Sequence, residues 1–240
     1  MGTQIETIEP VQKAQAFLSA DEICALRKYT TPTVSNAIEI LTGKREGYFT
    51  TQEVRCLYPA LGPMVGYACT AISMSGQPAR SRRHFPRRDY WAYVASSPKP
   101  RVIVMQELSS PPLGAFWGEV HSNIHKALGC EGVLLNGYVR DVEEVRDLKF
   151  HFLVSGISVS HAYAHLEDYD RDVEVFGMRV ASGDLIHADR HGAVVIPRDC
   201  AHDIAATCAK IVEEETSIFQ LCRSKDFSIA ALDPLVTPDY

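Results

Sequence analysis

The sequence predicts a mixed α/β domain built around one continuous core. Helical and strand-like segments alternate in the first half of the chain. The second half contains short strand-like segments joined by tight turns, a pattern typical of antiparallel strands. Hydrophobic residues make up 46% and charged residues 22% of the 240 residues, so enough apolar material is present for a sizeable core. The sequence shows no internal repeat and no low-complexity linker.

Composition excludes several classes of protein. The net charge of −6 argues against a general nucleic-acid-binding protein. No apolar run approaches the roughly 20 residues that span a bilayer, and the N-terminal segment has no hydrophobic signal core. The seven cysteines contain no C-x-x-C pair and are interpreted as small buried apolar residues in a reducing compartment. We therefore expect a soluble cytoplasmic protein without nucleic-acid or membrane partners.

Two helices are expected near the N-terminus. Asp21 is a suitable N-cap for a helix over residues 22–28. Thr33 or Ser35 caps a second helix, which Gly43 ends.

After a connection over residues 44–63, core strands are expected at 64–74 and 101–106, because their residues are small, branched or apolar throughout. A short helix at 89–95 lies between them. Six basic residues precede this helix: Arg80, Arg82, Arg83, His84, Arg87 and Arg88. Either they form a solvated loop, or they form an anion funnel for a polycarboxylate substrate or an acidic neighbouring subunit.

The next segment combines structure with candidate chemistry. Gly118 precedes a helix over 119–128, a strand follows at 132–137, and Asp141 opens another helix. If the strand runs back beside the helix, Glu119 and the Arg140-Asp141 pair meet at one rim. Asp141 also fits a capping box with the Glu three residues later, so a purely structural role is the alternative.

The second half is expected to contain short strands within residues 152–158, 173–189 and 192–197. Asp184 and Asp189 lie in the connecting turns and are interpreted as structural. A long final helix follows Pro197.

The side chains near residue 118 suit an anionic substrate and a metal. Arg140 can clamp a carboxylate, Asp141 can hold a hard divalent cation, and Glu119 can hold the water of that cation. Backbone N–H groups after Gly118 attract an anion, as the carboxylate of a 2-oxo acid requires. The alternative is a helix start without a ligand. The pair His121 and His125 has zinc-like spacing but lacks the adjacent Glu of a zinc hydrolase, so ordinary half-buried histidines are expected.

The segments GEVHSNIHKALGCEGVLLNGYVRDVEEV and VFGMRVASGDLIHADRHGAVVIP resemble the family that contains 4-hydroxy-4-methyl-2-oxoglutarate aldolase and the ribonuclease E activity regulator. The family signature is an acidic residue, twenty residues and then Arg-Asp, which Glu119, Arg140 and Asp141 match. The resemblance implies a swivelling phosphohistidine-domain-like β/β/α fold in one domain over 30–222. A helical extension at 1–29 would precede it, and a tail at 223–240 would follow.

The resemblance also implies a divalent-metal-dependent class II aldolase that releases pyruvate from a 4-hydroxy-2-oxo acid and also decarboxylates oxaloacetate. Asp141 would ligate Mg²⁺ or Mn²⁺, Glu119 would hold metal-bound water, and Arg140 would stabilise the enolate. Amides at Gly118, Val120 and His121 would bind the substrate carboxylate.

The resemblance also implies an assembly of several subunits. The family forms homotrimers or hexamers, and a neighbour's Glu joins the site; here it would come from the Glu213 to Glu215 run. The alternative is a non-catalytic regulator of ribonuclease E type that binds another protein. Two features depart from the family: Glu119 stands where Asp is common, and residues 77–91 are unusually basic and aromatic.

Overall fold

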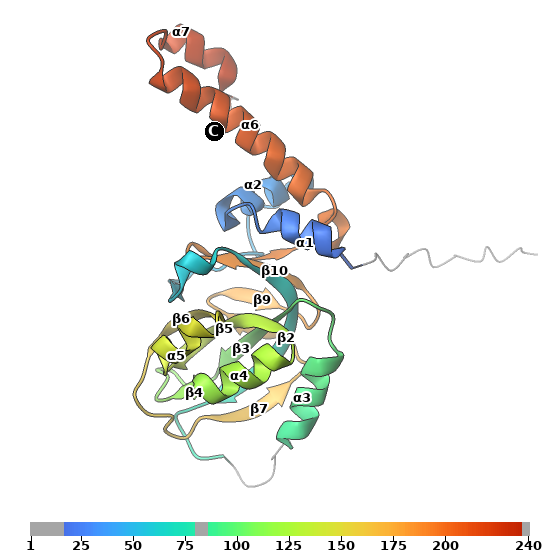
Figure 1. Ribbon diagram of the computed structural model, residues 1–240, viewed down its shortest axis with the longest axis vertical. Helices are drawn as coiled ribbons and strands as arrows, with labels where there is room; N and C mark the ends of the chain where they lie inside the picture. The colour runs from blue at the N-terminus through green and yellow to red at the C-terminus, as the bar shows by residue number, and fades with distance from the viewer. Residues whose placement is uncertain (1–16, 80–85, 237–240) are drawn as a thin grey trace, which may run out of the picture.

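The structure, a computed structural model, describes residues 17–79 and 86–236 (Figure 1). Its main sheet contains nine strands in these residues and curls into a nearly closed, barrel-like shape. The strands are β1 (Arg55–Cys56), β2 (Met64–Met74), β3 (Arg101–Glu107), β4 (Ala115–Trp117), β5 (Cys130–Val139), β6 (His151–Ile157), β7 (His165–Tyr169), β10 (Leu185–Asp189) and β11 (Gly192–Ile196). A separate hairpin is formed by β8 (Val173–Val175) and β9 (Met178–Val180). The predicted mixed α/β architecture is confirmed.

The helices lie around this sheet. They are α1 (Ala20–Leu26), α2 (Thr31–Thr42), α3 (Arg87–Ser96), α4 (Glu119–Ala127), α5 (Val142–Asp147), α6 (Ile204–Arg223) and α7 (Ile229–Leu232). In Figure 1, α1 and α2 lie above the sheet near β10, α4 and α5 lie in front of its central strands, and α3 lies to their right. Helix α6 runs outward until α7 folds back on it. No helix in the described parts of the chain is both long and apolar enough to cross a membrane.

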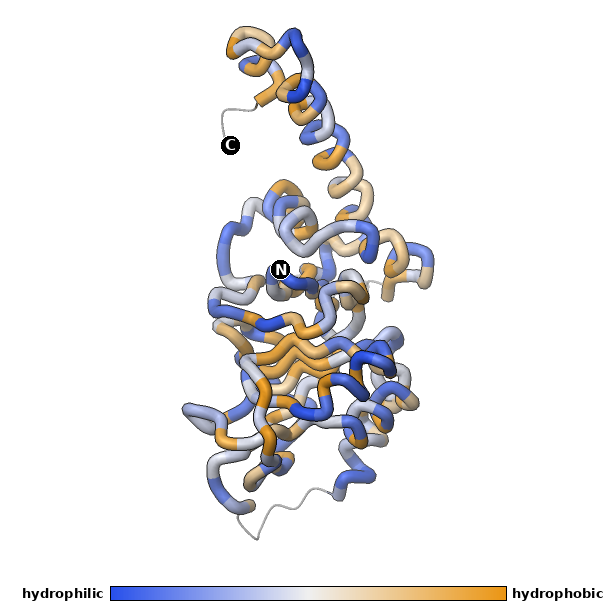
Figure 2. The backbone as a smooth tube through the Cα atoms, turned by 60° about the vertical axis from the view of Figure 1, so that its left-hand side comes forward, coloured by the Kyte–Doolittle hydropathy of each residue, from blue (hydrophilic) through white to orange (hydrophobic). Residues whose placement is uncertain are grey.

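Strand β2 holds the sheet together. It is buried along almost its whole length and runs parallel to β3, while β10 pairs antiparallel with its first half and β7 with its second half. Strands β3, β5 and β6 continue the sheet in parallel. Because both faces of these strands are covered, their sequences are apolar without alternation, as predicted for β2 and β3. The central strands form the orange band in Figure 2.

Two predicted helix starts are wrong. Ser19, not Asp21, caps α1, because the Ser19 and Glu22 side chains each bond the other residue's backbone N–H. Thr30, not Thr33 or Ser35, caps α2. The predicted end of α2 is confirmed, since Gly43 adopts a φ of 69° that favours glycine.

Asp184 and Asp189 are structural, as predicted. Asp184 accepts a hydrogen bond from the Ala181 N–H at 2.8 Å within its turn. The buried Asp189 carboxylate accepts the Thr31 N–H at 2.9 Å and the His191 N–H at 2.8 Å. The contact with Thr31 joins the first turn of α2 to the end of β10, 158 residues later in the chain.

Other expectations need correction. Strand β7 and helix α7 were not predicted. In the case of β7, the sequence HLEDY is polar, and all five of its residues are only half-buried. Cys24 and Cys222 are exposed, and Cys56 is intermediate, so the interpretation of all seven cysteines as buried is wrong. Of the basic cluster, residues 80–85 lie outside the described residues, and Arg87 and Arg88 are exposed at the start of α3.

Arg101 connects the ends of two helices. Its buried guanidinium donates hydrogen bonds to Ala95 O at 2.6 Å in the last turn of α3, to Ser97 O at 2.8 Å just after it, and to Leu128 O just after α4. We expect Arg101→Leu to lower the free energy of unfolding by about 3 kcal/mol, because buried carbonyls lose charged donors. Urea unfolding measures this. Arg55→Leu, which removes an exposed ion pair with Glu53, should change stability by no more than about 0.5 kcal/mol. Equal midpoints for both variants would contradict the assignment.

Candidate functional site

The candidate site lies where two parallel strands end side by side. Trp117, the last residue of β4, pairs with Val139 at the end of β5, and the Arg140 N–H donates to Trp117 O at 2.9 Å. The chain after β4 starts α4 and the chain after β5 starts α5, so both helix starts share one rim. The expected convergence of Glu119 with Arg140 and Asp141 is therefore present at the level of the backbone. The short strand β4, which makes it possible, was not predicted.

Asp141 does not cap the helix that it precedes. It stands at the N-cap position of α5, but its side chain makes no capping hydrogen bond, and its φ of 55° and ψ of 47° are left-handed. Its Oδ2 instead accepts the backbone N–H of Glu119 at 3.0 Å, and Arg140 Nε lies 3.7 Å from the same oxygen. The capping-box interpretation of Asp141 is wrong. The residue has an unusual backbone conformation, and its carboxylate bonds the start of a different helix. It is therefore a stronger candidate for a functional role than a carboxylate that caps its own helix.

Gly118 makes this arrangement sterically possible. A Cβ at this position would lie 2.4 Å from Asp141 Oδ2 and 3.1 Å from Arg140 Cγ. The backbone of Gly118 is extended, with φ −158° and ψ −162°, so the requirement is for space. Glycine therefore permits the Asp141 carboxylate to reach the first turn of α4.

Glu119 contributes to the site through its backbone. Its side chain is exposed and makes no hydrogen bond or ion pair within residues 17–79 and 86–236. Over the same residues, no group of three or more His, Cys, Asp or Glu side chains is arranged to hold a metal ion.

A pocket of about 450 Å³ opens beside Asp141. Gly118, Val120, His121, Arg140 and Asp141, all predicted site residues, line it. The other residues that line the pocket were not predicted from the sequence. The basic and aromatic character of residues 77–91 was the one signal, and it points to Arg87, Tyr90 and Trp91. These additional residues are Arg87, Tyr90, Trp91, Ala115, Phe116, His161, Ala164, His165 and Leu166.

Two histidines of α4 are neutral at physiological pH. Burial lowers the pKa of His121 to about 4, and the positive charges of Arg87 and Arg140 lower it further. Burial likewise lowers the pKa of His125 to about 4, and its ring nitrogens lie 2.7 Å from His121 O and 3.1 Å from the Tyr90 hydroxyl. Since both His125 nitrogens have partners, this pair does not form the i, i+4 zinc site. His121 Nδ1 is buried and has no hydrogen-bond partner among residues 17–79 and 86–236.

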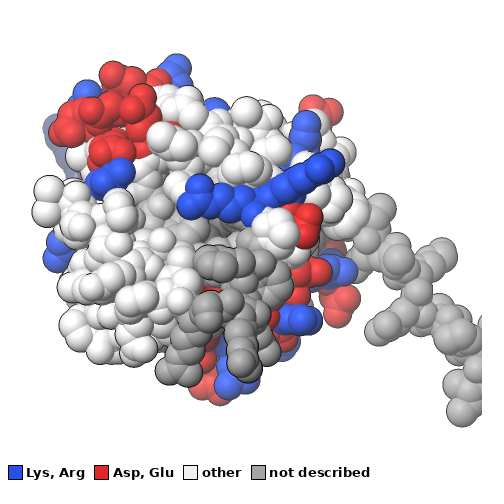
Figure 3. Space-filling model, turned by 90° about the horizontal axis from the view of Figure 1, so that it is seen from below, with Lys and Arg blue, Asp and Glu red and all other residues white. Residues whose placement is uncertain are grey.

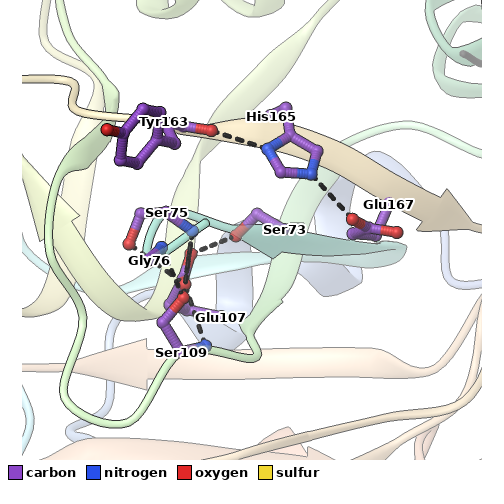
Figure 4. A network of polar contacts seen from close by, with 8 residues as sticks. All are labelled: Ser73, Ser75, Gly76, Glu107, Ser109, Tyr163, His165 and Glu167. Carbon is purple, nitrogen blue, oxygen red and sulfur yellow. Dashed lines mark hydrogen bonds and ion pairs between the residues drawn. The ribbon is translucent and has the colours of Figure 1, made fainter. Parts of the chain in front are cut away.

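A polar network lies beside His165, one of the residues that line the pocket (Figure 4). The buried Glu107 carboxylate accepts hydrogen bonds from the Ser73 hydroxyl at 2.9 Å, the Ser75 N–H at 2.8 Å and the Ser109 N–H at 3.0 Å. It thereby ties the end of β2 to the segment that leads towards β4. Beside it, the His165 ring lies between Tyr163 O, 2.6 Å away, and Glu167 Oε1, 2.7 Å away.

Charge is unevenly spread around this end of the molecule. The face in Figure 3 carries a line of Lys and Arg side chains across its middle and a group of Asp and Glu side chains towards one edge.

The chain is an α/β protein in which an Arg-Asp pair lies beside the start of a helix. The helix start and the Arg side chain are both suited to anionic ligands. The family model RraA-like (Aldolase/RraA) matches residues 31–195, and the chain belongs to this family, as the sequence resemblance indicated. The family includes aldolases and ribonuclease E regulators, its members are oligomeric, and many use divalent metals.

The chain is similar to one curated protein in sequence and to two solved structures in fold. An uncharacterised protein of Methanocaldococcus jannaschii is 32% identical over 105 residues, which are 43% of this chain and 50% of that protein. The chain thus spans about half the length of this curated relative. A solved structure from Pseudomonas syringae has a TM-score of 0.72 at 19% identity, covering 95% of this chain and 98% of that one. Streptomyces coelicolor RraAS2, described as an unusual member of the RNase ES inhibitor RraA family, has a TM-score of 0.66 at 22% identity, covering 86% and 98%.

Proposed function

We propose that the protein is a divalent-metal-dependent lyase that cleaves a 4-hydroxy-2-oxo acid, of the class of 4-hydroxy-4-methyl-2-oxoglutarate, to pyruvate, and that it also decarboxylates oxaloacetate. The observation that carries the proposal is the Asp141 carboxylate, turned away from α5 and held at the first turn of α4 beside Arg140. The Asp141 side chain makes no capping bond to its own helix and lines the pocket together with Arg140.

The residues fit Mg²⁺ or Mn²⁺. Mg²⁺ is commonly bound through one or two carboxylates and keeps several waters. Oδ2 of Asp141 is engaged by Glu119 N–H, whereas Oδ1 has no hydrogen bond within the described chain and is available to a cation. Asp141 would hold the metal directly, and Glu119 would hold it through water. A bound metal supplies Lewis-acid polarisation of the 2-oxo group.

The other site residues have roles that follow from their positions. The N–H groups of Val120 and His121 in the first turn of α4 face no intrahelical acceptor and would bind the substrate carboxylate. The half-exposed guanidinium of Arg140 would stabilise the negative charge that develops on the 2-oxo oxygen when the C3–C4 bond breaks. Glu119 would orient the metal-bound water that carries the proton. Its side chain is one methylene longer than that of the Asp that is common at this position.

The assembly is part of the proposal. We place the catalytic domain at 30–222, with an extension at 1–29 and a tail at 223–240, in a swivelling phosphohistidine-domain-like fold and a cytoplasmic homotrimer or hexamer. Helix α6 projects from the body in Figure 1 and carries Glu213, Glu214 and Glu215. One of these would enter the site of a neighbouring subunit.

The test is to measure pyruvate release from 4-hydroxy-4-methyl-2-oxoglutarate and from oxaloacetate with Mg²⁺ or Mn²⁺ and with EDTA. We expect turnover that EDTA abolishes and added metal restores. Turnover that is independent of metal would reject the mechanism. The structural similarity to an unusual member of the RNase ES inhibitor RraA family is the reason to consider one alternative, a non-catalytic regulator. Capture of a ribonuclease from lysate together with the absence of turnover would support that alternative.

Gly118→Ala should impair the same site without unfolding the protein. The new Cβ would displace Asp141 Oδ2, which lies 2.4 Å from its position, while the extended backbone accepts alanine. We expect kcat/KM to fall roughly a hundredfold, as expected for a misplaced catalytic group. Gly43→Ala, at a left-handed position far from the pocket, should instead lower the melting temperature and leave the kinetics unchanged. Steady-state kinetics and thermal unfolding of both variants distinguish the two effects.

A further inference from the structure

Two arginines from different parts of the chain line the pocket. Arg140 follows β5, and Arg87 is the first residue of α3. Burial is the main cause of the low pKa of His121, and both positive charges lower this pKa further, so both act on one ring of the pocket wall. The pocket therefore carries two guanidinium groups, whereas the carboxylate of a simple 2-oxo acid needs only one partner of this kind.

The two arginines differ in how far their charge is already neutralised. Arg140 Nε lies 3.7 Å from the Asp141 carboxylate. The Arg87 guanidinium makes no hydrogen bond and no ion pair within the part of the chain that the structure describes. Any positive charge on His165, another residue of the pocket wall, is offset by Glu167 at 2.7 Å. Arg87 is thus available to an anionic group of a ligand.

The position of Arg87 on α3 directs it to the pocket. Tyr90 and Trp91 follow it by three and four residues, and all three line the pocket, because residues at this spacing share one face of a helix. The neighbouring Arg88 is equally exposed but is not among the residues that line the pocket. The aromatic rings beside Arg87 displace water, which strengthens its attraction for a bound anion.

We propose that Arg87 binds the second carboxylate of a five-carbon 2-oxo diacid, and that this contact makes the pocket favour aldol cleavage over decarboxylation. Asp141, Arg140 and the first turn of α4 would bind the 2-oxo acid end of the same molecule. The inference rests on the proposed function and assigns its specificity to one residue, in the basic segment that departs from the family.

The two reactions differ in what happens to the second carboxylate. In aldol cleavage the 4-hydroxyl loses its proton, the C3–C4 bond breaks with its electron pair moving to C3, and C4 becomes a carbonyl, so the C5 carboxylate stays charged. In the decarboxylation of oxaloacetate the electron pair also moves to C3, but the C4 carboxylate leaves as neutral CO₂. In both reactions the enolate then takes up a proton to give pyruvate. The contact with Arg87 is therefore retained in the first transition state and lost in the second.

Steady-state kinetics of Arg87→Gln test this difference. We expect kcat/KM for 4-hydroxy-4-methyl-2-oxoglutarate to fall about tenfold, because a hydrogen bond to a charged group is lost from the transition state. For oxaloacetate, KM and kcat should rise together, because the contact is lost from the ground state alone. Arg88→Gln is the matched control and should change neither reaction. An equal fall in kcat/KM for both substrates, or an unchanged aldol cleavage, would overturn the inference.

Binding gives a readout that does not depend on turnover. Oxamate mimics pyruvate, and N-oxalylglycine carries a second carboxylate at the same distance along the chain as C5 of the diacid. Isothermal titration calorimetry with the full chain and Mg²⁺ should give N-oxalylglycine a Kd about tenfold lower than that of oxamate. Arg87→Gln should remove this advantage and leave the Kd of oxamate within about twofold, whereas Arg88→Gln should retain the advantage.

The outcomes separate the inference from the function on which it rests. An equal Kd for the two ligands in the parent protein, or an advantage of N-oxalylglycine that persists in Arg87→Gln, would overturn the inference alone. Failure of both ligands to bind, together with the absence of pyruvate release from both substrates, would overturn the proposed function as well.

Discussion

Asp141→Ala is expected to reduce pyruvate formation at saturating Mg²⁺ by about a thousandfold or more. The carboxylate at the start of α4 is the proposed metal ligand, and Lewis-acid activation is worth several kcal/mol, where about 1.4 kcal/mol corresponds to tenfold in rate. The loss should appear in kcat as well as in kcat/KM, because the interaction strengthens as charge develops on the substrate.

The fold should survive this substitution. Asp141 makes one hydrogen bond to a backbone N–H and an ion pair with half-exposed partners, and neither connects buried elements. Mn²⁺ binding followed by electron paramagnetic resonance gives a readout that does not depend on turnover, and its affinity should fall in parallel. Asp147→Ala, at the exposed end of α5, is the matched control and should retain both turnover and Mn²⁺ affinity. Full activity of Asp141→Ala would reject the assignment.

Acid should begin to destabilise the protein at a pH above the range in which carboxylates titrate. Burial lowers the pKa values of four histidines from 6.5 to about 4: His121, His125, His151 and His187. The folded state holds these rings neutral, whereas the unfolded chain protonates them near pH 6.5. The unfolded state therefore binds more protons between about pH 6.5 and pH 4, and stability is retained above this window and lost as pH falls through it.

The expected magnitude is large. At pH 5 each of these histidines costs roughly 2 kcal/mol relative to neutral pH. Four such terms are comparable with the whole stability of a typical domain, about 5 to 15 kcal/mol. We expect urea-unfolding free energies to fall steeply between pH 7 and pH 5, with unfolding near or below pH 5.

A single substitution tests the cause. Burial accounts for most of the pKa shift of His151, and Gln at this position is uncharged at every pH in the window. His151→Gln should lessen the slope of unfolding free energy against pH by roughly a quarter, since one of four protons is removed. His161→Gln, at an exposed histidine, should leave the slope unchanged. Identical slopes for His151→Gln and the parent would contradict the explanation.

Much of the architecture could be predicted from local sequence. The central strands β2, β3 and β5 are continuous apolar runs, and Gly43 marks the end of α2 because few other residues adopt its backbone conformation. Local signals misplaced the starts of α1 and α2, where several Ser, Thr and Asp residues compete as caps. They missed β7, whose position depends on its pairing with β2.

The sequence by itself determined the family, the mixed α/β fold and the segment from Gly118 to Asp141, because these depend on residue types and spacings along the chain. Only the tertiary structure decided which groups the Asp141 side chain contacts. Its orientation depends on the pairing of β4 with β5 and on the space beside Gly118, which no local propensity encodes. The pocket wall was likewise decided by tertiary structure, because its residues Trp91 of α3, Phe116 of β4 and Leu166 of β7 come from distant parts of the chain.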